Sequence, residues 1–192
     1  KKRTAFIGAI LSLIPLGQPL LIKTGMVLSS SAVMLSLPEK VNAESADFYF
    51  DRAYEKSEKG DHYGAISDYT KAIELYPNDP NAYYNRGISK DELKDYYGAV
   101  SDYKKAIEID PQIVEAYNNI AYVMRNKEIN DNYGAIFYAT KAIEINPNHS
   151  NAYLNRGVAK ENLGDMKGAC DDWRKASSLG NENTAKWVRI QC

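Results

Sequence analysis

A short pattern that returns at regular intervals decides the fold. Residues 63–66 read Tyr-Gly-Ala-Ile, and the pattern returns as Tyr-Gly-Ala-Val at 97–100, as Tyr-Gly-Ala-Ile at 133–136 and, more loosely, as Lys-Gly-Ala-Cys at 167–170. The alanines of successive copies lie 34, 36 and 34 residues apart. A fixed period of this length indicates structural repeats that stack on one another.

Each copy opens a stretch with helical periodicity. After Ala65, apolar residues recur every three or four positions, which predicts a helix with one apolar face. The first stretch ends at Pro77, and Pro111 and Pro147 end the next two, because proline cannot continue a helix. A second helix is expected before each stretch, from about residue 47 to residue 58 in the first repeat. Its close approach to its partner would need the small residues Ala53, Gly87, Ala121 and Gly157.

The unit resembles the tetratricopeptide repeat. That family carries an aromatic residue, a small residue four positions later, an alanine, a second aromatic four positions after it, and a proline. Residues 80–113 have all five, whereas the third copy has Ala139 in place of the second aromatic and the fourth has Gly180-Asn181 in place of the proline. The residues of the complete copy are Tyr83, Gly87, Ala99, Tyr103 and Pro111.

The resemblance covers residues 46–180 and implies an all-α fold for a domain of residues 44–192. The expected architecture is a right-handed superhelical solenoid of four helix-turn-helix repeats. An amphipathic stretch at 182–192 is expected to form a C-terminal capping helix. The repeats are expected at 46–79, 80–113, 114–149 and 150–181.

Two departures from the family pattern carry structural predictions. Where the family usually has another aromatic residue, this chain has Lys56, Lys90, Met124 and Lys160. We expect the lysine stems to cover the seam between helices while their ammonium groups reach water. Two extra residues near 126–132 predict a longer turn in the third repeat.

Residues 1–43 differ from the rest and have the order of an export signal. Three basic residues at 1–3 precede apolar runs at 5–22 and 26–37, and Val-Asn-Ala at 41–43 offers a small-residue cleavage site. Pro15 and Pro19 interrupt the first run, which disfavours a stable membrane-spanning helix. A cleaved signal and an uncleaved anchor both fit, and either one predicts that the repeats are exported to a periplasm, a lumen or the extracellular space.

The composition excludes several classes of protein. With 44% hydrophobic residues and a net charge of −1, the chain is neither a disordered tail nor a polybasic nucleic-acid binder. No nucleophile elbow, phosphate-binding loop or metal-ligand spacing occurs in the repeats, so we expect no enzyme activity, cofactor or metal. The acidic pair Asp171-Asp172 is interpreted as solvated surface charge.

The two cysteines, Cys170 and Cys192, lie on either side of Gly180. If the two helices run antiparallel around that glycine, their cysteine-bearing ends meet. In an oxidising compartment this arrangement predicts a disulfide that fastens the cap. Two unpaired thiols are the alternative.

The concave surface of such a solenoid, lined by the first helix of each pair, is the candidate binding site. One polar residue per repeat stands two positions before the small residue, and in the resembling family asparagines there can hold an extended peptide backbone. The alternative is that these side chains bond neighbouring helices. The polar positions are Asp51, Asn85, Asn119 and Asn155, and beside them lie Phe50, Tyr54, Tyr84, Ile88, Asn118, Tyr122, Leu154 and Val158.

Together these features predict a non-catalytic scaffold that binds an extended polypeptide segment, and assembly of an envelope or membrane complex is its expected setting. Five acidic residues on the first helices predict a neutral or basic segment, and contact with a membrane is expected only through an uncleaved N-terminal segment. The alternative is a structural protein that self-associates into a homo-oligomer and is anchored at a membrane. The five acids are Asp47, Asp51, Glu58, Glu92 and Glu115.

Overall fold

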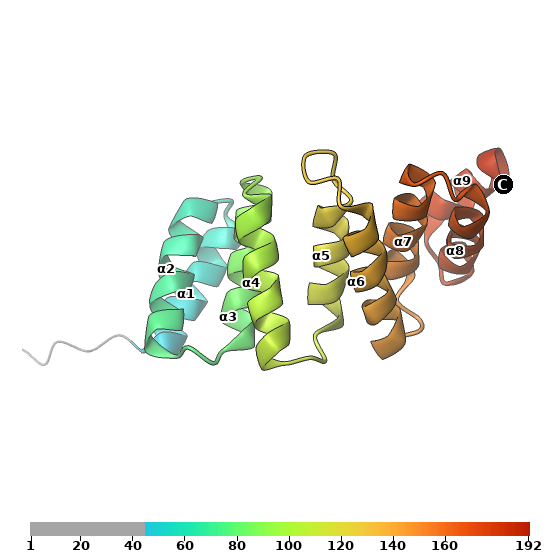
Figure 1. Cartoon of the computed structure of the whole chain (residues 1–192). Coiled ribbons are helices and arrows are strands. Elements are labelled where there is room, and N and C mark those ends of the chain that lie inside the picture. Colours follow the sequence, from blue (N-terminus) through green and yellow to red (C-terminus); the bar gives the residue numbers. More distant parts are fainter. Residues whose placement is uncertain (1–44) are drawn as a thin grey trace, which may run out of the picture. The chain divides into compact units, whose positions relative to one another are not determined.

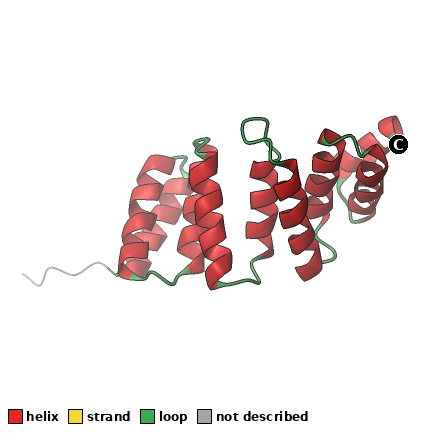
Figure 2. Ribbon diagram, in the orientation of Figure 1, coloured by secondary structure: helices red, strands yellow, loops and turns green. Residues whose placement is uncertain are grey.

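The computed structural model describes residues 45–192, so the predicted export signal or anchor lies outside the described residues. Within this part the backbone consists of nine helices joined by turns, without strands (Figure 2). The helices are α1 Ala46–Glu58, α2 His62–Leu75, α3 Pro80–Glu92, α4 Tyr96–Ile109, α5 Val114–Met124, α6 Asn132–Ile145, α7 Ser150–Asn162, α8 Met166–Ser178 and α9 Glu182–Gln191.

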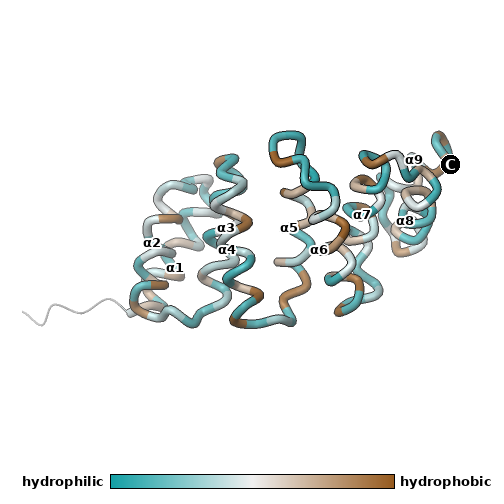
Figure 3. The backbone as a smooth tube through the Cα atoms, viewed as in Figure 1, coloured by the Kyte–Doolittle hydropathy of each residue, from teal (hydrophilic) through white to brown (hydrophobic). Residues whose placement is uncertain are grey.

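Consecutive helices pack against one another, and the pairs follow each other in chain order along the stack (Figure 1). This is the all-α solenoid that the repeat period predicts, with α9 packed on α8 at its C-terminal end. The turn from residue 125 to residue 131 projects beyond the neighbouring turns and is mostly hydrophilic (Figure 3). The prediction of a longer turn in the third repeat is therefore confirmed.

The recurring Gly-Ala pair has a local cause at the start of each second helix. Asp95 caps α4 by accepting a hydrogen bond from the Gly98 amide at 3.0 Å. A Cβ atom on Gly98 would overlap this carboxylate, and the next residue, Ala99, is fully buried. The capping aspartate, the glycine and the alanine thus form one unit. The same cap recurs with Asp61, Asp131 and Asp165.

Inside three of the four repeats, a buried aspartate on the second helix binds two cations on the first. In the second repeat, Asp102 accepts hydrogen bonds from Arg86 Nε and Nη2, both at 2.8 Å, and pairs with Lys90 Nζ at 2.8 Å. Only 4% of Asp102 is exposed. We name each such set an ion triad. The other two triads are Arg52–Lys56–Asp68 and Arg156–Lys160–Asp172.

The ion triads refine one prediction from the sequence and correct another. The lysine side chains are partly exposed, but their ammonium groups also form ion pairs, since Lys56 and Lys160 pair with Asp68 and Asp172 at 2.8 and 2.7 Å. Asp172 is not a solvated surface charge, because it is 4% exposed and bonded to both cations of its triad. Hydrogen bonding from Arg52 lowers the pKa of Asp68 to about 2.

The triad arginines also join neighbouring repeats. Arg86 Nη1 donates to Thr70 Oγ1 of the preceding repeat at 3.0 Å, and Arg156 Nη1 donates to Thr140 Oγ1 at 3.3 Å. A side chain that binds its own partner helix and the repeat before it fixes how the two repeats stack.

The third repeat replaces its ion triad with apolar side chains. Ile120, Met124 and Tyr138 stand where the second repeat has arginine, lysine and aspartate. Ile120 and Met124 are buried in a hydrophobic cluster that joins α4, α5 and α6, and Tyr138 packs against it. Lys104 occupies the threonine position of the preceding repeat. The junction between the second and third repeats therefore lacks an arginine–threonine contact and is packed largely through apolar side chains.

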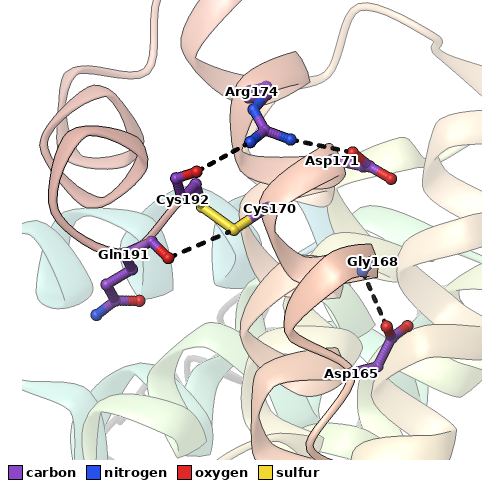
Figure 4. The surroundings of a disulfide bond; sticks show 7 residues. All are labelled: Asp165, Gly168, Cys170, Asp171, Arg174, Gln191 and Cys192. Carbon is purple, nitrogen blue, oxygen red and sulfur yellow. Dashed lines mark hydrogen bonds and ion pairs between the residues drawn. A yellow bond between two sulfur atoms is a disulfide. The ribbon is translucent and has the colours of Figure 1, made fainter.

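A disulfide joins Cys170 near the start of α8 to Cys192, with the two Cα atoms 5.7 Å apart. Arg174 of α8 donates to the Cys192 backbone oxygen at 3.3 Å and pairs with Asp171 (Figure 4). Trp173 and Trp187 pack edge to face, with ring centroids 5.3 Å apart. The cap is thus held to the last repeat by a covalent bond and by aromatic packing.

The apolar residues that replace the ion triad in the third repeat can be transferred to the second repeat to test the ion triads. We expect Asp102→Ala to lower the free energy of unfolding by about 3–5 kcal/mol, because it leaves two cations without their buried partner. The triple variant Arg86→Ile, Lys90→Met and Asp102→Tyr should unfold within about 2 kcal/mol of wild type, because packed apolar residues can replace a buried ion cluster. Urea denaturation followed by circular dichroism measures both; a triple variant less stable than Asp102→Ala would contradict the expectation.

The disulfide should contribute measurably to stability. We expect Cys192→Ser to lower the free energy of unfolding by about 3 kcal/mol, because the bond constrains a loop of 22 residues in the unfolded chain. Thermal melts of the oxidised wild type, the reduced wild type and the variant provide the comparison. Equal melting temperatures for oxidised and reduced wild type would show that the cap does not depend on the bond.

Candidate functional site

All twelve predicted binding residues lie on the first helices of the pairs, α1, α3, α5 and α7, whose surface we name the first-helix face. The structure places three of them on each helix. Tyr54 on α1 and Tyr122 on α5 are the most open of the aromatic members, with 50% and 48% of their surface exposed. The partly buried apolar and aromatic members are Phe50, Tyr84, Ile88, Leu154 and Val158.

The carboxamides at the C-terminal end of this face bond neighbouring helices. Asn155 is 3% exposed, its Nδ2 donates to Asn118 Oδ1 at 2.9 Å, and its Oδ1 accepts from Arg125 Nε at 3.0 Å. Asn119 Nδ2 donates to the Tyr84 hydroxyl at 3.3 Å. Burial raises the pKa of Tyr84, so this hydroxyl stays protonated at neutral pH. These bonds link α3, α5 and α7, which favours the packing role for Asn119 and Asn155.

The polar residues at the N-terminal end are more available. Asn85 Nδ2 donates back to the Asn81 carbonyl of its own helix at 2.9 Å, and no donor from the described residues bonds its Oδ1. Asp51 is exposed. The four predicted polar positions, Asp51, Asn85, Asn119 and Asn155, form a row that we name the ladder. It is therefore divided into an open half on α1 and α3 and a half engaged in helix packing on α5 and α7.

The electrostatics of the first-helix face follow from the ion triads. All basic residues within α1, α3, α5 and α7 belong to triads, where aspartates of the second helices bind them. The five acidic residues predicted to set the charge of this face are exposed and form no ion pair with any residue from 45 to 192. The uncompensated charge on the first helices is therefore negative.

A hollow of about 230 Å³ lies where α3, the turn after it and α5 come together. It is lined by Asp91 and Glu92 from the end of α3, Lys94 from the turn, Tyr96 from α4 and Tyr122 from α5. Of these, Tyr122 is one of the twelve predicted binding residues and Glu92 is one of the five acids predicted to set the charge of the face. The others lie three or more positions beyond Ile88, and their proximity to Tyr122 depends on how the second and third repeats stack.

No group of three or more His, Cys, Asp and Glu side chains within residues 45–192 is arranged to hold a metal ion. No helix in this part of the chain is long and apolar enough to cross a membrane.

Family models match three segments of the chain. Two models described as "Tetratricopeptide repeat" match residues 80–113 and 138–171, and one described as "TPR repeat" matches residues 53–89. A comparison with curated proteins finds no match.

Solved structures with a similar fold include two of MamA. "Crystal structure of MamA" is 24% identical with a TM-score of 0.67, and the alignment covers 74% of this chain and 82% of that one. "MamA 41-end from Desulfovibrio magneticus RS-1" is 20% identical with a TM-score of 0.70 and coverage of 76% and 82%. At this identity the similarity shows the fold alone.

The divided ladder predicts different outcomes for two asparagine variants. Asn155→Ala should lower the free energy of unfolding by about 1–3 kcal/mol, because it leaves Arg125 Nε and the Asn118 side chain without their partner. Asn85→Ala should change it by less than about 0.5 kcal/mol, because this side chain bonds only its own helix. Urea denaturation measures both. Equal losses for the two variants would contradict the division of the ladder.

Proposed function

The chain carries tetratricopeptide repeats, and we infer that it is a non-catalytic scaffold that binds an extended neutral or basic segment of a partner polypeptide on its first-helix face. The observation that carries this inference is the uneven pairing of charges. The cations of the first helices are bound by Asp68, Asp102 and Asp172, whereas the five acids predicted to set the charge of this face are exposed and unpaired within the described residues. A surface with unpaired negative charge attracts positive segments and rejects acidic ones.

The side chains between these acids suit an adaptable peptide contact. Tyr54 and Tyr122 present half-exposed rings, which combine apolar area with a polar hydroxyl. Asn85 offers its amide oxygen to a peptide N–H group, a use that its hydrogen bond to Asn81 leaves open. A segment lying along α1 and α3 would meet both kinds of group.

We also propose that the repeats act on the exported side of a membrane, in the assembly of an envelope or membrane complex. The order of charges and apolar runs in residues 1–43 supports export, and the Cys170–Cys192 disulfide fits an oxidising compartment.

Charge reversal on the two rows of helices tests the proposal. Asp51→Lys with Glu115→Lys should weaken binding of a fluorescent peptide of alternating serine and lysine by about tenfold or more. Glu74→Lys with Glu108→Lys, on α2 and α4, makes the same change in net charge away from the first-helix face and should leave the affinity within about twofold. Fluorescence anisotropy measures the affinities.

Three results would count against the proposal. Equal effects of the two charge reversals would place the binding elsewhere or reduce it to net charge. Preference for an acidic peptide over the lysine peptide would contradict the electrostatic argument. Absence of peptide binding, together with concentration-dependent sedimentation, would favour self-association instead.

A further inference from the structure

Two hollows lie among the described residues, and they differ in whether their charged side chains are paired with one another. A hollow of about 400 Å³ on α3 and α4 is lined by groups already paired with each other, Arg86 with Asp102 and Lys105 with Glu108. In the hollow beside Tyr122, neither Asp91 nor Glu92 forms an ion pair with any residue from 45 to 192. The second hollow therefore holds uncompensated negative charge.

We propose that the hollow lined by Asp91, Glu92, Tyr96 and Tyr122 receives the cationic side chain of one lysine or arginine in the bound segment. This inference rests on the proposed function and assigns a recognition position within it. Carboxylates attract an ammonium or guanidinium group directly, and an aromatic face adds a cation–π contribution.

The size and position of the hollow fit a single side chain. Its volume of about 230 Å³ is below the range of roughly 300–1,000 Å³ that is usual for small-molecule sites. It is also continuous with the first-helix face through Tyr122, so a segment lying on that face can insert a side chain without leaving it. The long aliphatic stem of lysine or arginine can cover the tyrosine rings while the charge reaches the carboxylates.

The surroundings of Asp91 disfavour its charged form, as expected for a carboxylate that has no cation bound to it. It is half-buried at the end of α3, next to Glu92. Burial first, and then repulsion from Glu92, raise the pKa of Asp91. An incoming cation would relieve both effects, because it replaces lost hydration and offsets the like charge.

Two resident cations lie nearby, and neither fills the position. Lys94 lines the hollow but is exposed, and it makes no ion pair with Asp91 or Glu92. The Arg125 guanidinium lies 4.9 Å from the centre of the Tyr122 ring, but its Nε is bonded to Asn155 and the residue does not line the hollow. Neither Asp91 nor Glu92 is therefore paired with a cation from residues 45–192.

Matched peptides test this position. The probes are one short fluorescent peptide of serine and threonine with a single central lysine, and the same peptide with acetyl-lysine, which removes the charge and keeps the length. Wild type should prefer the lysine peptide by about tenfold. Asp91→Asn with Glu92→Gln should reduce that preference to less than about twofold and leave the affinity for the acetyl-lysine peptide unchanged.

Tyr54 provides a matched control for Tyr122. The two tyrosines occupy the same position of their repeats and are equally exposed, but Tyr54 lines no part of this hollow. Tyr122→Ala should lower the preference for lysine, Tyr122→Phe should retain it because the ring remains, and Tyr54→Ala should not change it. Circular dichroism spectra establish that each variant is folded.

The outcomes separate the inference from the proposed function. If both peptides bind but wild type shows no preference for lysine, or the preference survives in Asp91→Asn with Glu92→Gln, the recognition position is overturned and the scaffold remains. If neither these probes nor the serine–lysine peptide binds, the proposed function fails and the recognition position fails with it.

Discussion

In every repeat but the third, the helix pair of this solenoid is joined by a buried carboxylate that holds two cations. In the first, second and fourth repeats, one aspartate of the second helix binds an arginine and a lysine of the first. The arginine satisfies its bidentate geometry and, in the second and fourth repeats, extends to a threonine of the preceding repeat. Removing the aspartate leaves two cations without their buried partner, so the set behaves as one element.

The same bonds determine the charge that a partner meets. Lysine and arginine on the first helices would make that face close to neutral if they pointed outward. Because the aspartates of the second helices bind them, the exposed acids are left to set the potential. The ion triads therefore hold the helices together in three of the repeats and also leave the first-helix face with negative charge.

The sequence was sufficient to predict the fold but predicted only part of the site. The 34-residue period, the prolines and the small residues fix the helix pairs, because each acts within one or two neighbouring helices. The sequence analysis does not predict the ion triads, although Arg86, Lys90 and Asp102 repeat with the same period, because it explains the lysines alone by stems that cover a seam. The proximity of Asp91 to Tyr122 depends on the stacking of two repeats, which no local pattern encodes.

The threonine contacts divide the four repeats into two pairs. Thr70 of the first repeat meets Arg86 of the second, and Thr140 of the third meets Arg156 of the fourth, whereas Lys104 and Ile120 occupy these two positions at the junction between the pairs. Each module of two repeats therefore contains one complete arginine–threonine contact. A chain lengthened by duplicating one module would keep every arginine–threonine contact, whereas insertion of a single repeat would break the alternation.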